Sequence, residues 1–394
     1  MSNLSDNQKT LQERSDIDVC RAEVHICLVS HQLLPNLLPV LDVAIRPREV
    51  VLLVTPKMAK EAERLKALLH DAGCRVSLWS VRAYRIEDIR ESVLHVITAY
   101  SDHRLALNAT GGTKVMALGA FGVFRDFDLP VFYVDSENGA MVSLSKPQKS
   151  VPLPDLLKVE TCLKCYGYKV VAVARPMLQA KNRQLYQALV SDIEQWQRSL
   201  ASLNYLAGEA KNHLWCTIKN SLLRDTHFVA LLELFQQADH LSVTDNRLGF
   251  AGEDSRRLVQ GGWLEQYVYS LIEELRRKKK VRDAAIGIRV ENKAGTSNEL
   301  DVACTYANRL HIVECKTANL QGGHAKGDDV VYKLDNLRDL MGGTYGRALL
   351  VSYRDMRKED RKRCRDNDVS VVCGRQLQQL EAVLPRWLNG ELLG

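Results

Sequence analysis

ELDVACTYANRLHIVECK, residues 299–316, is the segment that decides the fold of the C-terminal part of this 394-residue chain. Two strand-like runs, ELDVACTY and RLHIVECK, are separated by only two residues, which predicts an antiparallel hairpin with a two-residue loop. In this register Asp301 lies opposite Glu314. Because side chains alternate along a strand, both carboxylates share one face with Glu299 and Lys316. The opposite face is expected to point into the core and consists of Leu300, Val302, Val313 and Cys315.

Opposed carboxylates on neighbouring strands need a compensating charge, since like charges in that position destabilise the pair. A divalent cation such as magnesium or manganese binds carboxylate, phosphate and water oxygens, which is the coordination that phosphodiester hydrolysis uses. The pattern therefore indicates a metal site at Asp301 and Glu314, to which the main-chain carbonyl of Cys315 could add a ligand. Lys316 could position the attacking water and offset charge on the phosphate. The alternative is a solvated ladder of salt bridges on an exposed sheet face.

An amphipathic helix is expected ahead of the hairpin. In GGWLEQYVYSLIEELRRKKK, apolar residues recur at helical spacing and Glu265 lies beside this stripe. The order of this helix, N-E-L-D-V and I-V-E-C-K resembles the core of the PD-(D/E)XK nucleases over residues 261–353. The resemblance implies that Asp301 and Glu314 hold the metal, that Lys316 serves catalysis and that Glu265 joins them. The chain departs from the family pattern in having no proline before Asp301.

The N-terminal part has a different pattern. Over residues 24–134, short β-rich runs alternate with helical segments, beginning with VHICLVS, LLPNLLPVLDVA and VVLLVTP. This rhythm predicts a parallel sheet with helices on both faces. Ligands of such sheets bind at the carboxyl ends of the strands, which indicates the loops after Val29, Val54 and Leu107.

The third of these loops, in LNATGGTKV, has the composition of a phosphate-binding site. Main-chain amides at a helix N-terminus attract anions, glycines allow close approach, and a lysine adds positive charge. The sequence here is neither G-K-[ST] nor G-x-G-x-x-G, so ordinary ATP or NAD binding is not supported. The alternative is a glycine-containing turn with a helix cap. The candidate ligand-binding residues in this loop are Asn108, Thr110, Gly111, Gly112, Thr113 and Lys114.

This arrangement closely resembles the CARF domain, the CRISPR-associated Rossmann fold that senses cyclic oligoadenylates in type III CRISPR immunity. Two positions carry the resemblance, the loop Ser30-His31-Gln32 and the Asn108–Lys114 loop. A further contact is expected at Thr55, although this position could equally be a helix start. A CARF domain ahead of a PD-(D/E)XK nuclease is the architecture of the cyclic-oligoadenylate-activated ancillary nucleases. The resemblance implies a homodimer in which two Rossmann units share a pocket suited to cyclic tetra-adenylate.

We therefore expect an α/β multidomain chain with three parts. Residues 20–150 are expected to form a Rossmann-like CARF sensor domain with a parallel sheet. Residues 251–394 are expected to form a restriction-endonuclease-like PD-(D/E)XK nuclease domain. Between them, residues 151–250 include much of the proline-containing stretch SLSKPQKSVPLPDLL and then a helical or winged-helix-like module.

Composition excludes little. The formal net charge of +6 fits a nucleic-acid partner but is a mild excess for this length, and 46% apolar with 26% charged residues are globular values. The ten cysteines are scattered, and the C-x-x-C at Cys162 and Cys165 has no second pair at zinc spacing, so packing of reduced thiols is favoured over zinc binding. No signal peptide and no run of about 18 apolar residues is present. We expect a cytoplasmic protein without a membrane partner.

The expected function is that of a cyclic-oligoadenylate-activated, divalent-metal-dependent endonuclease acting on DNA, RNA or both in antiviral defence. Manganese or magnesium is the expected cofactor, and cleavage governed by backbone and strandedness is expected rather than base reading. One alternative is a ligand-independent repair or recombination nuclease, which would have no use for the Asn108–Lys114 loop. The other is a ligand-controlled DNA-binding regulator using the middle module, which would have no use for Asp301, Glu314 and Lys316 on one face.

Overall fold

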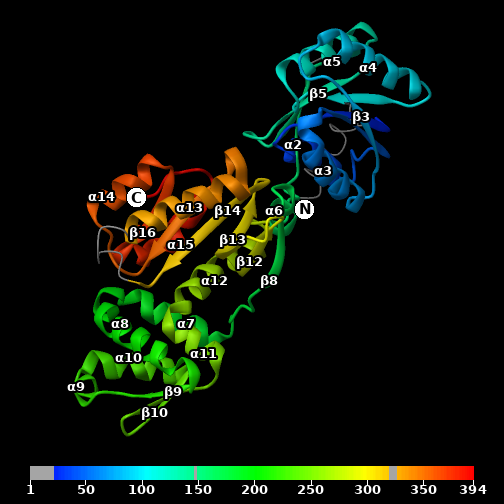
Figure 1. Ribbon diagram of the computed structural model, residues 1–394. Helices are drawn as coiled ribbons and strands as arrows, with labels where there is room; N and C mark the ends of the chain where they lie inside the picture. The colour runs from blue at the N-terminus through cyan, green and yellow to red at the C-terminus, as the bar shows by residue number, and fades with distance from the viewer. Residues whose placement is uncertain (1–21, 146–148, 319–325) are drawn as a thin grey trace, which may run out of the picture. The chain divides into compact units, whose positions relative to one another are not determined.

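The computed structural model describes residues 22–145, 149–318 and 326–394 (Figure 1). The chain forms two compact units, Met1–Lys169 and Val170–Gly394. Each unit has its own apolar core. Within the described residues, no helix is both long enough and apolar enough to span a membrane.

The first unit is built on a seven-stranded sheet in the order β3-β2-β1-β4-β5-β6-β7. The five strands from β3 to β5 are parallel, and β6 and β7 extend the sheet antiparallel. The predicted parallel sheet is therefore confirmed. Its strands are β1 (Val24–Leu28), β2 (Glu49–Val54), β3 (Arg75–Ser80), β4 (Leu105–Asn108), β5 (Val131–Asp135), β6 (Ala140–Ser143) and β7 (Ser150–Pro152).

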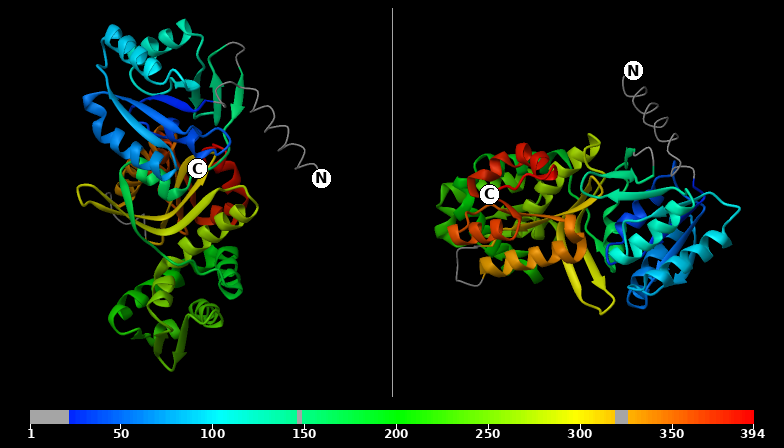
Figure 2. Two further views of the ribbon diagram at one scale, coloured as in Figure 1. Left: turned by 90° about the vertical axis from the view of Figure 1, so that its right-hand side faces the viewer. Right: turned by 90° about the horizontal axis from the view of Figure 1, so that it is seen from above.

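Helices cover both faces of this sheet, as the sequence predicts (Figure 2). One face packs on α4 and α5 and the other on α2 and α3, so that every residue of the central strand β1 is buried. Strands buried on both sides read as continuous apolar runs, which is the pattern of VHICL. The helices are α2 (Leu34–Leu41), η2 (Pro56–Met58), α3 (Ala59–Asp71), α4 (Ile86–Ala99), α5 (Lys114–Asp126) and α6 (Val159–Cys165).

The strand order of the first unit reverses at β1, because β2 lies on one side of it and β4 on the other. Loops that leave the two central strands in opposite directions open a crevice at their carboxyl ends, where ligands of such folds bind. The loops after β1 and β4 flank this point. These are the loops that contain Ser30-His31-Gln32 and Asn108–Lys114.

The second unit contains a six-stranded sheet in the order β16-β15-β14-β13-β12-β8. The pairs β12–β13 and β13–β14 are antiparallel, while β14–β15 and β15–β16 are parallel. The strands are β8 (Tyr168–Val173), β12 (Asp283–Asn292), β13 (Ser297–Tyr306), β14 (Arg309–Lys316), β15 (Arg347–Ser352) and β16 (Val369–Cys373). The helices are α12 (Trp263–Arg277), α13 (Lys326–Gly342), η5 (Gly343–Tyr345), α14 (Lys358–Asp366), η6 (Gly374–Gln379) and α15 (Leu380–Leu388).

The predicted hairpin is confirmed in β13 and β14. Tyr306 pairs with Arg309, and the two loop residues Ala307 and Asn308 have φ of 50° and 56°. Positive φ at both positions is the type I′ turn that matches the twist of a two-residue hairpin. The residues expected to face the core, Leu300, Val302, Val313 and Cys315, are all buried.

The second unit also contains a middle module, residues 180–257, made of helices and a small sheet. After α8 come a strand, two helices and a hairpin, which is the element order of a winged helix. Its apolar residues belong to the same core cluster as those of the six-stranded sheet. Its elements are α7 (Ala180–Ser191), α8 (Ile193–Glu209), η3 (Ala210–Asn212), β9 (Trp215–Thr217), α9 (Asn220–Leu223), α10 (Thr226–Gln237), β10 (Leu241–Thr244), β11 (Arg247–Phe250) and α11 (Glu253–Arg257).

The cysteines of the C-x-x-C motif pack inside the first unit. Cys162 and Cys165 lie buried in α6, and burial raises the pKa of both thiols well above its ordinary value. Buried neutral thiols behave as small apolar side chains. The predicted packing of these two side chains in the core is confirmed.

Candidate active site and ligand-binding loops

A kinked entry into α12 sets the position of Glu265. Residues Leu258–Gly262 form a π-helical turn, and Gly261 within it has a φ of 134°. A Cβ at Gly261 would lie 2.2 Å from Oγ1 of Thr317, the residue that follows Lys316. Only glycine therefore lets the start of α12 lie against the end of β14. This contact brings the first turn of the helix, with Glu265, to the acidic end of the hairpin.

Asp301 interrupts the main-chain pairing of the hairpin. The β13–β14 ladder runs from Tyr306–Arg309 to Val302–Val313. Beyond it, Oδ2 of Asp301 accepts the main-chain N–H of Cys315 at 2.7 Å. The carboxylate thus stands beside the last residues of β14, as the predicted register requires, and one of its oxygens is fixed by a hydrogen bond.

Glu314 and Lys316 form the other half of the cluster. Nζ of Lys316 lies 2.5 Å from Oε1 of Glu314, whose side chain is only 4% exposed. The second carboxylate oxygen, Oε2, is buried and has no hydrogen-bond partner. An unpaired buried carboxylate oxygen is costly, so this atom requires a ligand.

Burial and neighbouring acids raise the pKa of two carboxyls in this cluster. Burial, together with the charges of Asp301 and Glu299, raises the pKa of Glu265 to about 8. Burial and the neighbouring Glu314 raise the pKa of Asp301 to about 7. Burial lowers the pKa of Lys316, but the adjacent carboxylates outweigh it and the net pKa is raised, so that its amine stays protonated. When these carboxyls are ionised, the one ammonium does not balance them, and the site is then short of positive charge.

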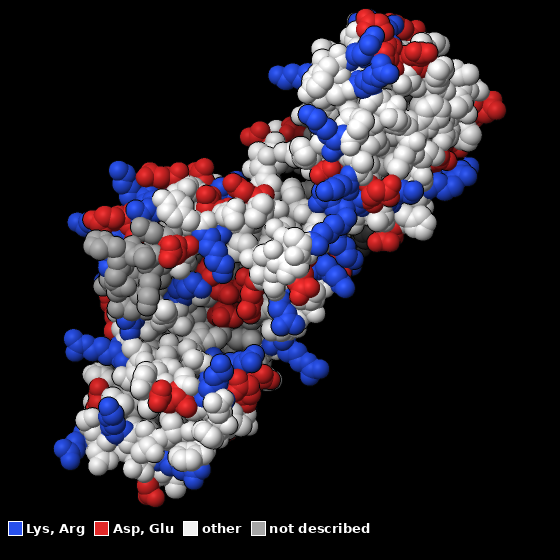
Figure 3. Space-filling view, in the orientation of Figure 1, with Lys and Arg blue, Asp and Glu red and all other residues white. Residues whose placement is uncertain are grey.

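This donor set fits a divalent cation. It consists of carboxylate oxygens, one of them buried without a partner, in a region where the protein alone leaves negative charge uncompensated. Among the described residues, no group of three or more His, Cys, Asp or Glu side chains could by itself hold a metal ion. Catalytic magnesium sites commonly use one or two carboxylates and complete the shell with water and phosphate oxygens. Figure 3 shows acidic side chains gathered over the β13 and α12 region of the second unit.

All four predicted catalytic residues therefore come together, from α12, β13 and β14. Sequence reasoning missed the role of Gly261, although the pair G-G directly before W-L-E is a signal for an unusual turn at that point. It also missed the tilted packing of Trp263 against Tyr353, with ring centroids 6.2 Å apart, which anchors the start of α12 to the segment after β15.

In the first unit, Asn108 is fully buried and all its polar contacts are internal. Its Nδ2 donates to the carbonyl of Pro35 at 2.9 Å and to Oδ1 of Asn36 at 3.1 Å. Its Oδ1 accepts from the N–H and the hydroxyl of Thr110, at 3.2 and 2.6 Å. Asn36 in turn donates to the carbonyl of Leu28. Sequence reasoning missed Asn36, which ties the loops after β1 and β4 together.

The next residues of the loop also shape it. The hydroxyl of Thr110 accepts the N–H of Val134 at 2.7 Å, which fixes the loop to β5. A Cβ at Gly111 would lie 2.0 Å from the carbonyl oxygen of Leu28, so only glycine fits against the end of β1. Thr113 caps α5 by accepting the N–H of Met116 at 3.2 Å. This capped N-terminus presents the main-chain amides that favour an anion.

Other predicted ligand residues are accessible at the same edge of the sheet. Lys114, the first residue of α5, is exposed, as are His31 and Gln32 after β1. His31 lies 3.6 Å from a carboxylate oxygen of Glu61 on α3. The half-buried Ser30 donates to the carbonyl of Gln32 at 3.3 Å. Gly112, with a φ of 73°, is partly exposed, whereas Thr55 at the start of η2 is 6% exposed.

Two family models match the chain. Residues 24–160 match the Card1 CARF domain, and residues 252–390 match the Card1-like endonuclease domain. Among curated proteins, no sequence matches.

Several solved structures are similar to the chain. Protein VC1899 from Vibrio cholerae is 26% identical, with a TM-score of 0.87 over 93% of this chain and 98% of that one. Can2 from Sulfobacillus thermosulfidooxidans, in complex with cyclic tetra-adenylate (cA4), is 29% identical, with a TM-score of 0.80 over 93% of this chain and 99% of that one. A type III CRISPR defence DNA nuclease activated by cyclic oligoadenylate is 21% identical, with a TM-score of 0.53 over 84% of this chain and 45% of that one, and shares the fold.

Proposed function

We propose that cyclic tetra-adenylate bound in the CARF domain activates this chain to cleave nucleic acid, because the chain belongs to the CARF-domain nucleases of type III CRISPR defence. Its Card1 CARF domain is followed by a Card1-like endonuclease domain. The observation that carries this proposal is the pairing of the two matched domains with a carboxylate–lysine cluster in the second. The similarity to Can2, whose structure contains cyclic tetra-adenylate, supports the ring size.

In the active site, we assign Asp301 and Glu314 as the ligands of a divalent cation, with the carbonyl of Cys315 as a further oxygen donor. The unpaired Oε2 of Glu314 supports this assignment. Magnesium or manganese, when bound, supplies the positive charge that polarises the scissile phosphate and acidifies water. Burial and the charge of Asp301 raise the pKa of Glu265, so that its carboxyl holds a proton near neutral pH in the metal-free protein. In the proposed site this carboxyl orients water.

Lys316 has a separate role in this proposal. Its ammonium is held at 2.5 Å by Glu314 and stays protonated. From there it donates hydrogen bonds to the attacking water or to a phosphate oxygen and stabilises the charge that develops in the transition state. Since these groups act on a phosphodiester, which DNA and RNA share, both nucleic acids belong in the test.

In the CARF domain, the residues divide into two groups. Asn108, Thr110, Gly111 and Thr113 build the loop through internal contacts. Lys114 at the start of α5 is exposed, and we propose that its amine and the N-terminus of α5 bind a phosphate of the ring, a role that suits a cation and a helix N-terminus. Five further residues complete the proposed pocket. They are Ser30, His31 and Gln32, which follow β1 and are exposed or partly exposed, together with Thr55 and Gly112.

We further propose that the active form is a homodimer formed through the α4–α5 side of the CARF domain. This surface exposes large apolar side chains, with Leu118 66%, Ile86 39% and Leu94 36% exposed. Leu118 lies one helical turn after Lys114 on the same side of α5. A second copy that buried Leu118 across a two-fold axis would therefore bring two phosphate-binding helix starts together, as a four-fold repeating ring requires.

The test is a cleavage assay with manganese, single-stranded and supercoiled DNA, and RNA, with and without cyclic tetra-adenylate. Cleavage is expected only with both ligand and metal, and Glu314→Ala should reduce it by about 10³-fold or more, because the metal loses a ligand. Glu291→Ala, which removes an exposed carboxylate from β12, is the matched control and should retain activity. Ligand-independent cleavage would instead identify a repair nuclease, and ligand-controlled binding without cleavage would identify a regulator.

A further inference from the structure

The small sheet of the middle module has one face on the core and one face in solvent. In the order β10-β11-β9, Leu248 and Phe250 of β11 point inward and are buried. The alternate residues of β11, and the residues of β9 and β10 that pair with them, point outward, because side chains alternate along each strand. We call this outward face the β9–β11 platform, which consists of Trp215, Thr217, Ser242, Thr244, Arg247 and Gly249.

An aromatic and a cation form the centre of the β9–β11 platform. The guanidinium carbon of Arg247 lies 4.0 Å from the ring centroid of Trp215, and the Trp215 side chain is 42% exposed. The register explains this contact: Trp215 is paired with Gly249, which has no side chain, so Arg247 from the neighbouring pair lies across the ring. The ring of His213 follows at 6.5 Å from Trp215.

The charge of the platform suits a polyanion. Its six outward residues include no carboxylate; the other side chains are hydroxyls. Bases of unpaired nucleic acid stack on tryptophan rings and on arginine guanidinium planes, and the same cation attracts the phosphates. A stacking pair surrounded by small hydroxyl side chains is therefore suited to a single strand.

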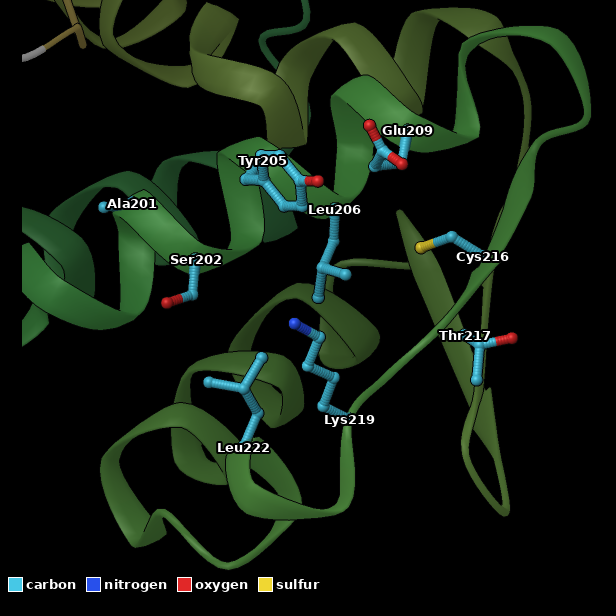
Figure 4. Close-up of a pocket in the computed structure, with 9 residues that line it drawn as sticks. All are labelled: Ala201, Ser202, Tyr205, Leu206, Glu209, Cys216, Thr217, Lys219 and Leu222. Atoms are coloured by element: carbon cyan, nitrogen blue, oxygen red, sulfur yellow. The ribbon is translucent and has the colours of Figure 1, made fainter.

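Two other surfaces of the module are less suited to nucleic acid. In a winged helix the second helix of the pair, here α10, reads duplex DNA, but the sequence of α10, THFVALLELFQQ, contains no lysine or arginine. A pocket of about 570 Å³ lies between α8, β9 and α9 (Figure 4), and its only two charged lining residues are Glu209 and Lys219, of opposite sign. The platform differs from both in that its exposed aromatic ring is in contact with a cation and none of its six residues is acidic.

We propose that the β9–β11 platform binds a single-stranded segment of the nucleic-acid substrate, with a base stacked on the Trp215–Arg247 pair and a phosphate held by Arg247. This inference rests on the proposed function, because it assigns the substrate of the same enzyme a second contact within the second unit. It also makes unpaired strands the favoured substrate class.

The experiment measures binding separately from cleavage. In the full-length Glu314→Ala protein, with cyclic tetra-adenylate, the fluorescence anisotropy of a labelled single strand and of the matching duplex is titrated. Trp215→Ala should weaken binding of the single strand by about tenfold, equivalent to about 1.4 kcal/mol, since stacking of one base contributes on this order. Trp215→Phe should recover most of this loss, and Arg247→Ala should weaken binding to a similar extent.

Two matched variants in the same module serve as controls. Tyr205→Ala removes an aromatic side chain that is 66% exposed but lies outside the platform. Arg224→Ala removes an equal charge from the exposed end of α9. Both should change the affinity for the single strand by less than about twofold, because neither removes a stacking surface from the platform.

With Glu314 intact, Trp215→Ala should raise the KM for a long single strand and leave kcat unchanged. The proposal is overturned if Trp215→Ala and Arg247→Ala bind the single strand as tightly as their parent, or if both lose as much affinity for the duplex. Failure of the proposed nuclease function would appear as absent cleavage in the wild-type protein. That result leaves the anisotropy measurement as an independent test of the platform.

Discussion

Raising the pH of the metal-free protein should destabilise its nuclease unit through Glu265 and Asp301. The pKa of these carboxyls is raised to about 8 and about 7, by burial and by neighbouring acids. Between the ordinary carboxyl range and these values, the folded protein holds protons that the unfolded chain has released. The unfolded state then binds fewer protons, so the free energy of unfolding falls as the pH rises.

The magnitude follows from the size of the pKa changes. Each tenfold change in a dissociation constant corresponds to about 1.4 kcal/mol. Both groups titrate about three pH units above their ordinary values. They share one mutual repulsion, and the site is partly open to water, so the two contributions do not add in full. We therefore expect the free energy of unfolding to fall by on the order of 3 kcal/mol. For a unit of this size, about 1 kcal/mol lowers Tm by roughly 2–4 °C, which gives a fall of about 6–12 °C.

Differential scanning calorimetry of the full-length protein with a chelator, between about pH 5 and pH 8.5, measures this fall. Glu265→Gln should flatten the dependence, because it removes one titrating group and its repulsion of Asp301, whereas Glu291→Gln, at an exposed position on β12, should follow the wild type. Manganese should raise Tm more at the higher pH, where the acids are ionised. Parallel curves for the wild type and Glu265→Gln would refute the reasoning, as would equal stabilisation by manganese at both ends of the range.

Gly261→Ala should cost at least about 2 kcal/mol in thermal denaturation and lower the cleavage rate by about 100-fold, because its Cβ would lie 2.2 Å from Oγ1 of Thr317 and displace the start of α12. The control Gly252→Ala, where a Cβ meets nothing within 4 Å, should retain activity, and equal behaviour of the two variants would contradict the assignment. Lys114→Ala should weaken binding of cyclic tetra-adenylate by about tenfold in calorimetry without changing Tm, since it is exposed and proposed to hold a phosphate. Asn108→Ala should lower stability by about 2 kcal/mol or more, because it removes a buried network; an unchanged Tm would show that the network is dispensable.

The residues that share a face of one local element were predictable from the sequence. The two-residue spacing between ELDVACTY and RLHIVECK leaves one economical turn, and strand alternation then puts Glu314 and Lys316 on the same face. The parallel sheet of the first unit followed in the same way from the alternation of apolar runs and helical segments. These properties depend on neighbours along the chain, and a period of two or of 3.6 residues is visible without any partner.

Contacts between distant segments were decided by the tertiary structure. The sequence marks Glu265 as one polar residue beside an apolar stripe, and only the contact of Gly261 with Thr317 brings its helix to the hairpin. The same holds for Asn108, which reads as a ligand residue in its loop but in the fold bonds to Asn36 and builds the loop from inside.

Trp215 and Arg247 likewise meet only because β9 and β11 pair in a particular register. Sequence periodicity therefore determined the orientation of side chains on each element. Packing determined which elements meet, because that depends on the shapes of surfaces that no single segment contains.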